Sequence, residues 1–196
     1  MPDPRIVVLV SGAGTLLQAL LDSGIRKSIV AVGSDQPEAP ALARARAGDV
    51  PTFVVPMADD REEWNRDVVE HLQAHEADLV VTAGFMRVLG EPVIEAFKNR
   101  IINSHPALLP SFSGAHAVRD AVESGVKVTG CTIHIVDEGV DTGPIVAQCP
   151  VAVEDSDTVE SLHERIKEHE RTLLVDVLGR IVREGVSVDG RTVAFG

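Results

Sequence analysis

The sequence IVVLVSGAGTLLQALLDSG, residues 6–24, decides the fold of the first half of the chain. It opens with a continuous apolar run, Ile6–Val10, which is typical of a strand buried on both faces of a parallel sheet. A Gly-rich turn follows at residues 12–15. Leucines then recur at helical spacing from Leu16, and the helix ends at Gly24. A strand, a Gly-rich turn and a helix in this order favour an anion, because free backbone N–H groups and the helix dipole meet at the turn.

The Gly-rich turn is open to three interpretations: a phosphomonoester site, a purely structural tight turn, or part of a dinucleotide site. The dinucleotide fingerprint requires a third glycine, but Leu17 occupies that place, whereas Asp35 lies about 20 residues further on, where a ribose-binding acid is found. We expect Gly14 to let the backbone approach an anion closely. Replacing Gly14 by valine should then weaken anion binding with the fold intact.

The same alternation of strand and helix patterns continues through the first half. We expect further strands at residues 29–32, 51–55 and 78–83, with helices at residues 39–47 and 59–75. This order predicts an α/β fold, a doubly wound and mostly parallel sheet with a Rossmann-like N-terminal half. Ligands of such sheets bind beyond the carboxyl ends of the strands. Residues 11–15, 84–90 and 103–110 all begin at such ends.

The stretch Asn103-Ser104-His105-Pro106 follows the apolar pair Ile101-Ile102 at an expected strand end. Residues two apart in an extended chain point to the same side, so Asn103 and His105 face one way. The Asn103 amide can donate to a developing oxyanion, and the His105 imidazole can donate or accept a proton near neutral pH. The alternative is an ordinary turn after a strand, with Asn103 capping it and His105 half exposed.

The second half predicts an antiparallel strand pair, residues 127–137 and 145–153, joined by the Asp141 loop, residues 138–144. Asp141 in this loop is either a turn residue or part of a site. A last helix follows, which Asp157 can cap, with Glu160 three residues later. Glu170 falls on the apolar face of this helix, so it either pairs internally or reaches a ligand. Asp189-Gly190 predicts a terminal hairpin.

The apolar loop, residues 84–90, is bulky and bracketed by glycines, with Arg87 as its cation. It either packs on the core with Arg87 reaching water, or it forms a slot for a flat ring with Arg87 available to a carboxylate.

Composition sets the limits of the function. The chain has 196 residues, of which 44% are hydrophobic and 24% charged, which predicts one globular domain or two packed halves. Its net charge of −12 makes nucleic acid a poor partner. Ile6–Val10 is too short for a signal or membrane segment. The two cysteines, Cys131 and Cys149, lack metal spacing and are expected as free thiols in a reducing cytoplasm.

Taken together, these segments resemble the glycinamide ribonucleotide formyltransferases, folate-dependent enzymes of purine biosynthesis. The resemblance runs from about Ile6 to Val182, and its most specific parts are His105-Pro106-Ala107-Leu108-Leu109-Pro110, Gly114-x-His116, Gly130-x-Thr132-x-His134, Asp141-Thr142-Gly143-Pro144-Ile145 and Gly84-Phe85-Met86-Arg87-Val88-Leu89. It implies a single formyltransferase domain over residues 1–196. Residues 1–100 would bind the nucleotide and its phosphate, and residues 101–196 would carry catalysis and folate binding.

The resemblance further implies that the amine of glycinamide ribonucleotide attacks the formyl group of 10-formyltetrahydrofolate, without a metal. It assigns catalysis to Asn103, His105 and Asp141, the nucleotide's phosphate to Gly12, Ala13, Gly14, Thr15 and Leu16, and a nucleotide contact to Glu170. It assigns folate contacts to Met86, Arg87, Val88, Leu89, Glu138, Gly139 and Val140. Two positions depart from the family pattern: Leu16 replaces a frequent Asn, which removes one phosphate-side donor, and Ser113 replaces a frequent Pro.

Several alternatives stay open at this point. A formyltetrahydrofolate deformylase would share the same three catalytic residues, but it carries an additional N-terminal domain. Methionyl-tRNA formyltransferase adds a C-terminal domain and requires a basic surface. A nicotinamide-dependent dehydrogenase or a phosphosugar-binding module without catalysis would be of another class. The oligomeric state is also open, with a homodimer as one alternative.

Overall fold

The computed structural model describes residues 3–196, which fold into two compact units. The N-terminal unit ends at Asn103 and the C-terminal unit begins at Ser104. The parallel strands of the first unit and the antiparallel pair of the second confirm the predicted fold class.

The N-terminal unit is built on parallel strands in the order β3-β2-β1-β4-β5. The strands are β1 (Ile6–Val10), β2 (Ile29–Ser34), β3 (Thr52–Val54), β4 (Leu79–Thr82) and β5 (Ile101–His105), whose last two residues belong to the C-terminal unit. All of β1 is buried, because strands flank it on both sides and helices cover both faces of the sheet. The continuous apolar run of β1 follows from this position.

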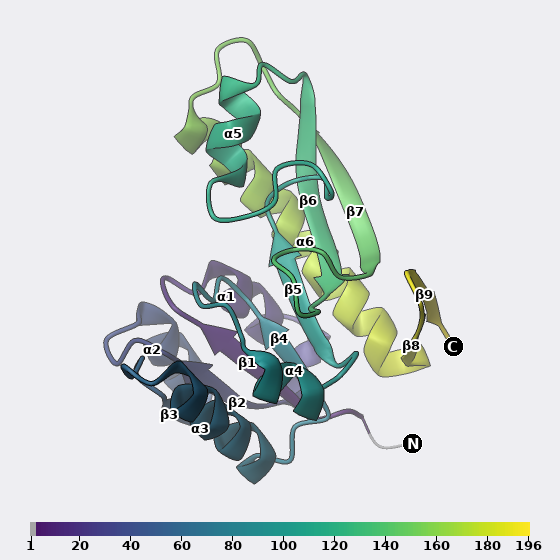
Figure 1. The fold of residues 1–196 in the computed structure, drawn as a ribbon. Helices are drawn as coiled ribbons and strands as arrows, with labels where there is room; N and C mark the ends of the chain where they lie inside the picture. Colours follow the sequence, from purple (N-terminus) through teal and green to yellow (C-terminus); the bar gives the residue numbers. More distant parts are fainter. Residues whose placement is uncertain (1–2) are drawn as a thin grey trace. The chain divides into compact units, whose positions relative to one another are not determined.

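Helices cover both faces of this sheet because the chain reverses direction across it. From β1 it proceeds to β2 and β3, and then it returns to β4 and β5 on the other side of β1. Right-handed crossovers therefore place α1 and α2 on one face and α3 and α4 on the other, as Figure 1 shows. The helices are α1 (Thr15–Leu21), α2 (Pro40–Ala47), α3 (Arg61–Ala74) and α4 (Glu91–Ala96), with a 3₁₀ turn η1 (Gly24–Ser28).

The reversal places the ends of β1 and β4 side by side, where open α/β sheets bind their ligands. Val10 pairs with Ser34 of β2, and Leu9 pairs with Thr82 of β4. The backbone N–H of Ser11 donates to the carbonyl of Gly84 over 3.1 Å, which joins the two strand ends directly. The Gly-rich turn and the apolar loop thus begin at neighbouring points of one edge.

The C-terminal unit consists of an antiparallel pair that the long helix α6 covers (Figure 1). Its elements are α5 (Ala117–Glu123), β6 (Val128–Ile135), β7 (Ile145–Ala152), α6 (Val159–Glu184), β8 (Val186–Asp189) and β9 (Thr192–Phe195). The predicted Asp-Gly hairpin is present as β8 and β9, with Gly190 at a φ of 57°.

One predicted detail of α6 is wrong. The helix is capped by Thr158, whose side chain accepts from the backbone N–H of Ser161, and not by Asp157. Asp157 instead accepts two hydrogen bonds from the Arg165 guanidinium, at 2.7 and 2.8 Å. Asp157 also accepts the backbone N–H of Glu154, which precedes the helix, over 2.8 Å. Its carboxylate thus holds Arg165 and the approach to the helix, while Thr158, the residue directly before the first turn, caps it.

Candidate active site

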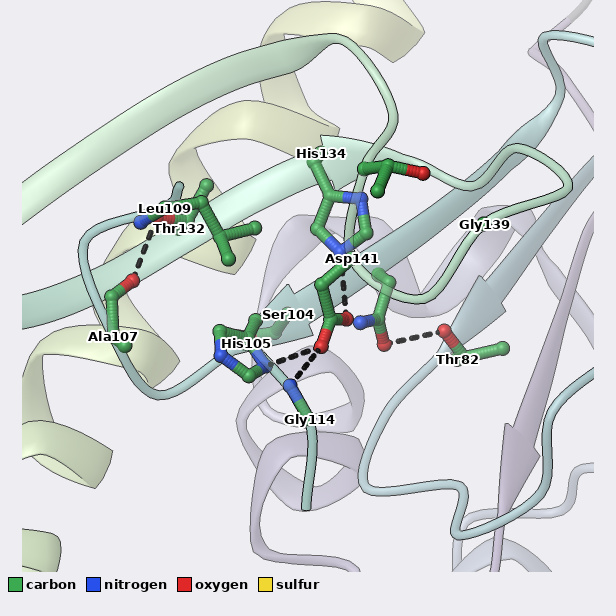
Figure 2. Close-up of polar contacts among 12 residues, drawn as sticks. Thr82, Ser104, His105, Ala107, Leu109, Gly114, Thr132, His134, Gly139 and Asp141 are labelled. Carbon is green, nitrogen blue, oxygen red and sulfur yellow. Dashed lines mark hydrogen bonds and ion pairs between the residues drawn. The ribbon is translucent and has the colours of Figure 1, made fainter. Parts of the chain in front are cut away.

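The C-terminal unit places two histidines against one carboxylate. His105 Nδ1 at the end of β5 lies 3.3 Å from Asp141 Oδ2, and His134 Nε2 on β6 lies 3.6 Å from Asp141 Oδ1. The backbone N–H of Gly114 donates to Oδ2 of the same carboxylate over 2.8 Å. Figure 2 shows the carboxylate of Asp141 between the two imidazoles. The sequence-based pairing of His105 with Asp141 is therefore present as a direct contact.

The surroundings of Asp141 keep it ionised. Burial alone would raise the pKa of this carboxyl group, but the contact with His134, the hydrogen bond from Gly114 and the charge of His105 outweigh burial and lower its pKa. The backbone of Asp141 adopts a left-handed φ of 56°, which is uncommon for a residue other than glycine. Such a conformation persists where the surrounding structure determines it, and it is common at functional sites.

Hydrogen bonds fix the Asp141 loop at both ends. The hydroxyl of Thr142 donates to Asp137 Oδ1 over 2.6 Å, and the N–H of Gly139 donates to the same oxygen over 3.1 Å. From the terminal hairpin, Arg191 Nη1 donates to the carbonyl of Thr142 over 2.9 Å. The loop is thus held on both sides of Asp141, while the side chain of Val140 is 52% exposed.

His105 has an acceptor at each ring nitrogen. Its Nε2 lies 2.8 Å from the carbonyl of Phe112, and its Nδ1 faces Asp141. Only the doubly protonated ring can donate to both acceptors. The side chain of His105 is 5% exposed, so the alternative of an ordinary turn with a half-exposed His105 is wrong on this point.

Asn103 occupies the same strand, two residues before His105, and belongs to the N-terminal unit. The Thr82 hydroxyl lies 2.7 Å from Asn103 Oδ1. This contact orients the amide, so that its carbonyl end faces Thr82 of the neighbouring strand β4. The alternation of side chains along β5 places residues 103 and 105 on the same side of their strand.

The two glycines of the Gly-rich turn have different surroundings. The backbone is open at Gly12, as an anion requires, and crowded at Gly14. Gly14 has a φ of 72°, and a Cβ added there would lie 2.6 Å from Cβ of Ala41. The expectation that Gly14→Val leaves the fold intact is therefore wrong, because the new side chain would collide with α2. At Gly12, by contrast, an added Cβ meets no atom within 4 Å. Leu16 turns its side chain into the core.

Arg44 of α2 adds a cation to this turn that the sequence analysis missed. Its Nε donates to the carbonyl of Ala13 over 2.8 Å, and its Nη1 donates to Gln18 Oε1 over 3.1 Å. The sequence analysis did not single out Arg44, because only the packing of α2 on the turn reveals the contact.

The apolar loop exposes two of its hydrophobic side chains, while its cation, Arg87, pairs with a buried carboxylate. Met86 is 73% and Val88 56% exposed. Arg87 Nε lies 2.6 Å from Asp35 Oδ2, and the Ser11 hydroxyl donates to Asp35 Oδ1 over 2.6 Å. Arg87 therefore neither simply reaches water nor waits unpaired for a ligand. The fully buried Asp35 carboxylate has partners on both oxygens, which removes the ribose-binding acid of the dinucleotide interpretation.

Both charge and hydrogen bonds hold Asp35 ionised. Burial would raise the pKa of this carboxyl group, but hydrogen bonds from Ser11, Arg87 and Gln36, with the charge of Arg87, lower it. A buried carboxylate in this state binds its partners strongly.

Glu170 is buried in the C-terminal unit and pairs internally. Its Oε1 accepts from the hydroxyl of Ser104 over 2.6 Å, and the residue is 4% exposed. Burial raises the pKa of Glu170, and the hydrogen bond from Ser104 and the charges of Lys167 and Arg171 only partly offset that increase. A buried carboxyl group with one hydroxyl partner has hydrogen-bonding capacity to spare.

His134 is the main residue of this cluster that sequence reasoning did not assign to it. The alternation of β6 does place His134 opposite to the core residues Cys131, Ile133 and Ile135, so the available signal was its side of the strand. Within residues 3–196, no group of His, Cys, Asp and Glu side chains is arranged to hold a metal ion. None of the helices in that range is both long and apolar enough to span a membrane.

Comparisons with known proteins agree on one family. The profile of the formyl transferase family matches residues 4–178. The phosphoribosylglycinamide formyltransferase of Mycobacterium tuberculosis is 50% identical over 98% of this chain and 91% of its own length. The enzyme of that name from Bacillus subtilis is 35% identical over 91% of this chain and 94% of its own length.

Solved structures give the same result. The crystal structure of glycinamide ribonucleotide transformylase 1 from Symbiobacterium toebii matches with a TM-score of 0.94 and 42% identity, over 98% of this chain and 94% of that one. The phosphoribosylglycinamide formyltransferase from Anaplasma phagocytophilum matches with a TM-score of 0.91 and 38% identity, over 98% and 94% of the two chains.

Proposed function

Because the chain belongs to the formyl transferase family, we propose that it transfers the formyl group of 10-formyltetrahydrofolate to the amine of glycinamide ribonucleotide. The products are formylglycinamide ribonucleotide and tetrahydrofolate, and the reaction belongs to de novo purine biosynthesis. The phosphoribosylglycinamide formyltransferases that are 50% and 35% identical to this chain support this choice of substrates. The observation that carries the chemistry is the buried contact between His105 and Asp141 at the end of β5.

The chemistry requires donors for an oxyanion and an acceptor for a proton. When the amine nitrogen attacks the formyl carbon, the formyl oxygen becomes negative and the nitrogen becomes cationic. We assign the donor roles to the Asn103 amide and the protonated His105, since preorganised donors stabilise such an oxyanion. Asp141 orients His105 and accepts the proton of the amine, directly or through water. That proton then passes to the folate nitrogen as its bond to the formyl carbon breaks, which releases tetrahydrofolate.

His105 has to change one hydrogen bond to act in this way. Its Nε2 lies 2.8 Å from the Phe112 carbonyl, and Nδ1 faces Asp141. Donation to the oxyanion therefore replaces the bond to Phe112. Catalytic hydrogen bonds commonly reach their working geometry only when the substrate is bound. Asp141 retains its contact with His105 throughout, which keeps the ring oriented.

The substrate contacts follow from the family resemblance and fit the local structure. The open backbone at Gly12 and the nearby Arg44 guanidinium suit the nucleotide's phosphate, and the buried carboxyl group of Glu170 suits its hydroxyl groups. In the N-terminal unit, the exposed side chains of Met86 and Val88 suit the apolar ring of the folate. In the C-terminal unit, Val140 offers an exposed apolar side chain of the same kind. The free thiols of Cys131 and Cys149 are consistent with a reducing cytoplasm as the place of the reaction.

An absorbance assay for loss of 10-formyltetrahydrofolate tests the proposal directly. We expect turnover that requires glycinamide ribonucleotide, with one formylglycinamide ribonucleotide formed for each tetrahydrofolate. Equal turnover without the amine would show a deformylase instead. NADH serves as the control ligand, and tight binding of NADH would favour the dehydrogenase alternative.

Gly12→Ala tests the phosphate contact separately. The added methyl group meets no protein atom within 4 Å, so the fold should keep its melting temperature. It should nevertheless exclude a phosphate from the open backbone and raise the nucleotide KM, with the folate KM unchanged. Inorganic phosphate should compete with the nucleotide in the wild type. Competition with the folate would place the anion elsewhere.

A further inference from the structure

A buried carboxylate connects the Gly-rich turn to the apolar loop within the N-terminal unit. Asp35 follows β2, and its side chain is fully buried. The Ser11 hydroxyl, directly before the Gly-rich turn, donates to Asp35 Oδ1 over 2.6 Å. Arg87, in the apolar loop, donates from Nε to Asp35 Oδ2 over 2.6 Å. One carboxylate thus holds residues from the ends of β1 and β4 together.

Ser11 closes this network from the other side. Its hydroxyl oxygen accepts the backbone N–H of Met86 over 2.8 Å, while the hydroxyl hydrogen points at Asp35. Its own backbone N–H donates to the carbonyl of Gly84 over 3.1 Å. The first part of the apolar loop is therefore anchored at Gly84, Met86 and Arg87, and these three anchors lead to Ser11 or Asp35. Its last part is held by α3, where Arg61 donates to the carbonyl of Val88 and Asn65 accepts the N–H of Gly90.

We propose that Asp35 is a positioning residue that couples the nucleotide and folate contacts of this enzyme. This inference rests on the proposed function, because it takes the Gly-rich turn as the phosphate contact and the apolar loop as a folate contact. A ligand that orders one segment orders the other through Ser11 and Asp35. Binding of either substrate therefore reduces the conformational cost of binding the second.

The geometry explains why this role needs a carboxylate. Two oxygens are occupied at once by donors from two segments, and one of these donors is a guanidinium. Asparagine can still accept from Ser11 with its single oxygen, but its NH₂ group would face Arg87 and repel it. Asp35→Asn therefore breaks the contact to Arg87, together with that to the adjacent Gln36, and keeps the contact to Ser11. Ser11→Ala breaks the contacts to Asp35 and Met86 and leaves the Arg87 contact in place.

Calorimetry on the full chain measures the coupling. The dissociation constant of glycinamide ribonucleotide is determined without and with saturating tetrahydrofolate. In the wild type we expect the folate to tighten nucleotide binding about fivefold or more, the usual lower range for coupled sites. Asp35→Asn and Ser11→Ala should each bring that ratio close to one. Asp35→Asn should also weaken tetrahydrofolate binding, on the order of tenfold, because a charged hydrogen bond is lost.

Asp155→Asn is the matched control, since it makes the same chemical change at a side chain that is 90% exposed. It should keep the wild-type ratio. Melting temperatures verify the fold of each variant, and Ser11→Ala decides the question if Asp35→Asn does not fold. A wild-type ratio of one, or variants that keep the wild-type ratio, would overturn the inference while leaving formyl transfer intact. A wild type that binds neither substrate would instead overturn the proposed function.

Discussion

Asp141 combines a carboxylate with several partners and an uncommon backbone conformation. The carboxylate contacts two histidines and a backbone N–H, while the residue adopts a left-handed φ of 56°. Asparagine tolerates that conformation well, so Asp141→Asn keeps the backbone and deletes the charge. We expect kcat to fall by about 10²–10⁴, the usual contribution of a general base, with both KM values nearly unchanged. Steady-state kinetics measure this split.

Asp137→Asn provides the control within the same segment. Asp137 accepts only from Gly139 and Thr142 among its described contacts, and an amide oxygen can accept both bonds. This variant should retain most of its turnover. If Asp137→Asn and Asp141→Asn lose activity equally, the loss reflects the loop conformation and Asp141 is not the base.

The same substitution at Asp141 has a predictable effect on stability. The pKa of Asp141 is lowered in the folded state, so this group stabilises the fold above its unfolded value of 3.8, and the stabilisation is lost as the pH falls through the folded value. Asp141→Asn should therefore be less stable than the wild type at pH 7. The two proteins should converge in strongly acidic solution.

Glu170 predicts the opposite dependence. Burial raises its folded-state pKa, so the folded state holds more protons than the unfolded state, and the stability of the fold falls as the pH rises. Glu170→Gln removes this cost and can still accept from Ser104. At pH 7 we expect a gain of about 0.5–2 kcal/mol, which raises Tm by roughly 2–4 °C per kcal/mol in a chain of this size.

The gain in stability at Glu170 should accompany a loss of function. If the carboxylate binds the nucleotide's hydroxyl groups, Glu170→Gln should raise the nucleotide KM while leaving the folate KM unchanged. The stability difference should vanish as the pH falls well below the usual glutamate pKa of 4.5, where the wild-type side chain is protonated in both states. Melting curves at pH 7 and in this acidic range test the stability argument. A lower Tm for Glu170→Gln at pH 7 would contradict the argument.

At the scale of the elements, the sequence predicted strands and turns that have periodic or local signals. It did not predict side-chain contacts that depend on how the elements pack. The apolar run of β1, the alternation along β6 and the Asp-Gly hairpin are periodic or local signals, and each element is present. The contact between Arg44 and Ala13 joins residues 31 positions apart, and Asp35 meets Arg87 over 52 positions. Such pairings depend on the packing of α2 and on the strand order, which one sequence does not reveal.

The cap of α6 and the crowding at Gly14 illustrate the same limit. Asp157 satisfies the local rule for a cap, but Arg165, on the second turn of the helix, competes successfully for its carboxylate. Gly14 satisfies the rule for an anion-binding turn, but it also has to be a glycine because a side chain there would collide with Ala41 of α2. In both cases the residue type was informative, and its neighbour in space decided its role.

The terminal hairpin offers a test of long-range support for the Asp141 loop. Arg191 donates to the Thr142 carbonyl over 2.9 Å, and the Arg180 guanidinium lies 4.0 Å from the ring centroid of Phe195, which ties the hairpin to α6. We expect Arg191→Ala to raise the folate KM about two- to fivefold, the range for one solvent-exposed hydrogen bond. Arg191→Lys should restore part of the affinity. Arg183→Ala, an exposed change near the end of α6, is the control.

An unchanged folate KM in Arg191→Ala would show that the hairpin only covers the end of α6. An equal effect of Arg183→Ala would indicate that charge at this end of the chain, and not the contact with Thr142, alters folate binding.

For the whole molecule, net charge opposes substrate binding. The chain carries −12 at neutral pH, and both proposed substrates are anions, one through its phosphate and the other through its glutamate carboxylates. Field repulsion slows the approach of an anion to an acidic protein. Two cations lie next to the proposed contact segments, Arg44 beside the Gly-rich turn and Arg87 in the apolar loop. Both are partly buried and paired within the protein, so they act only at short range.

Salt separates these two effects. Raising the ionic strength from about 0.01 to 0.15 M shortens the Debye length from about 30 to 8 Å, which screens the distant negative charges more than the local contacts. We therefore expect kcat/KM for both substrates to rise with sodium chloride over this range, while kcat at saturation stays constant, because the chemical step takes place among buried groups. Stopped-flow association rates should follow the same trend. A steady fall of kcat/KM with salt would show that Arg44, Arg87 and the backbone of the Gly-rich turn, and not the net charge, govern the encounter with the substrates.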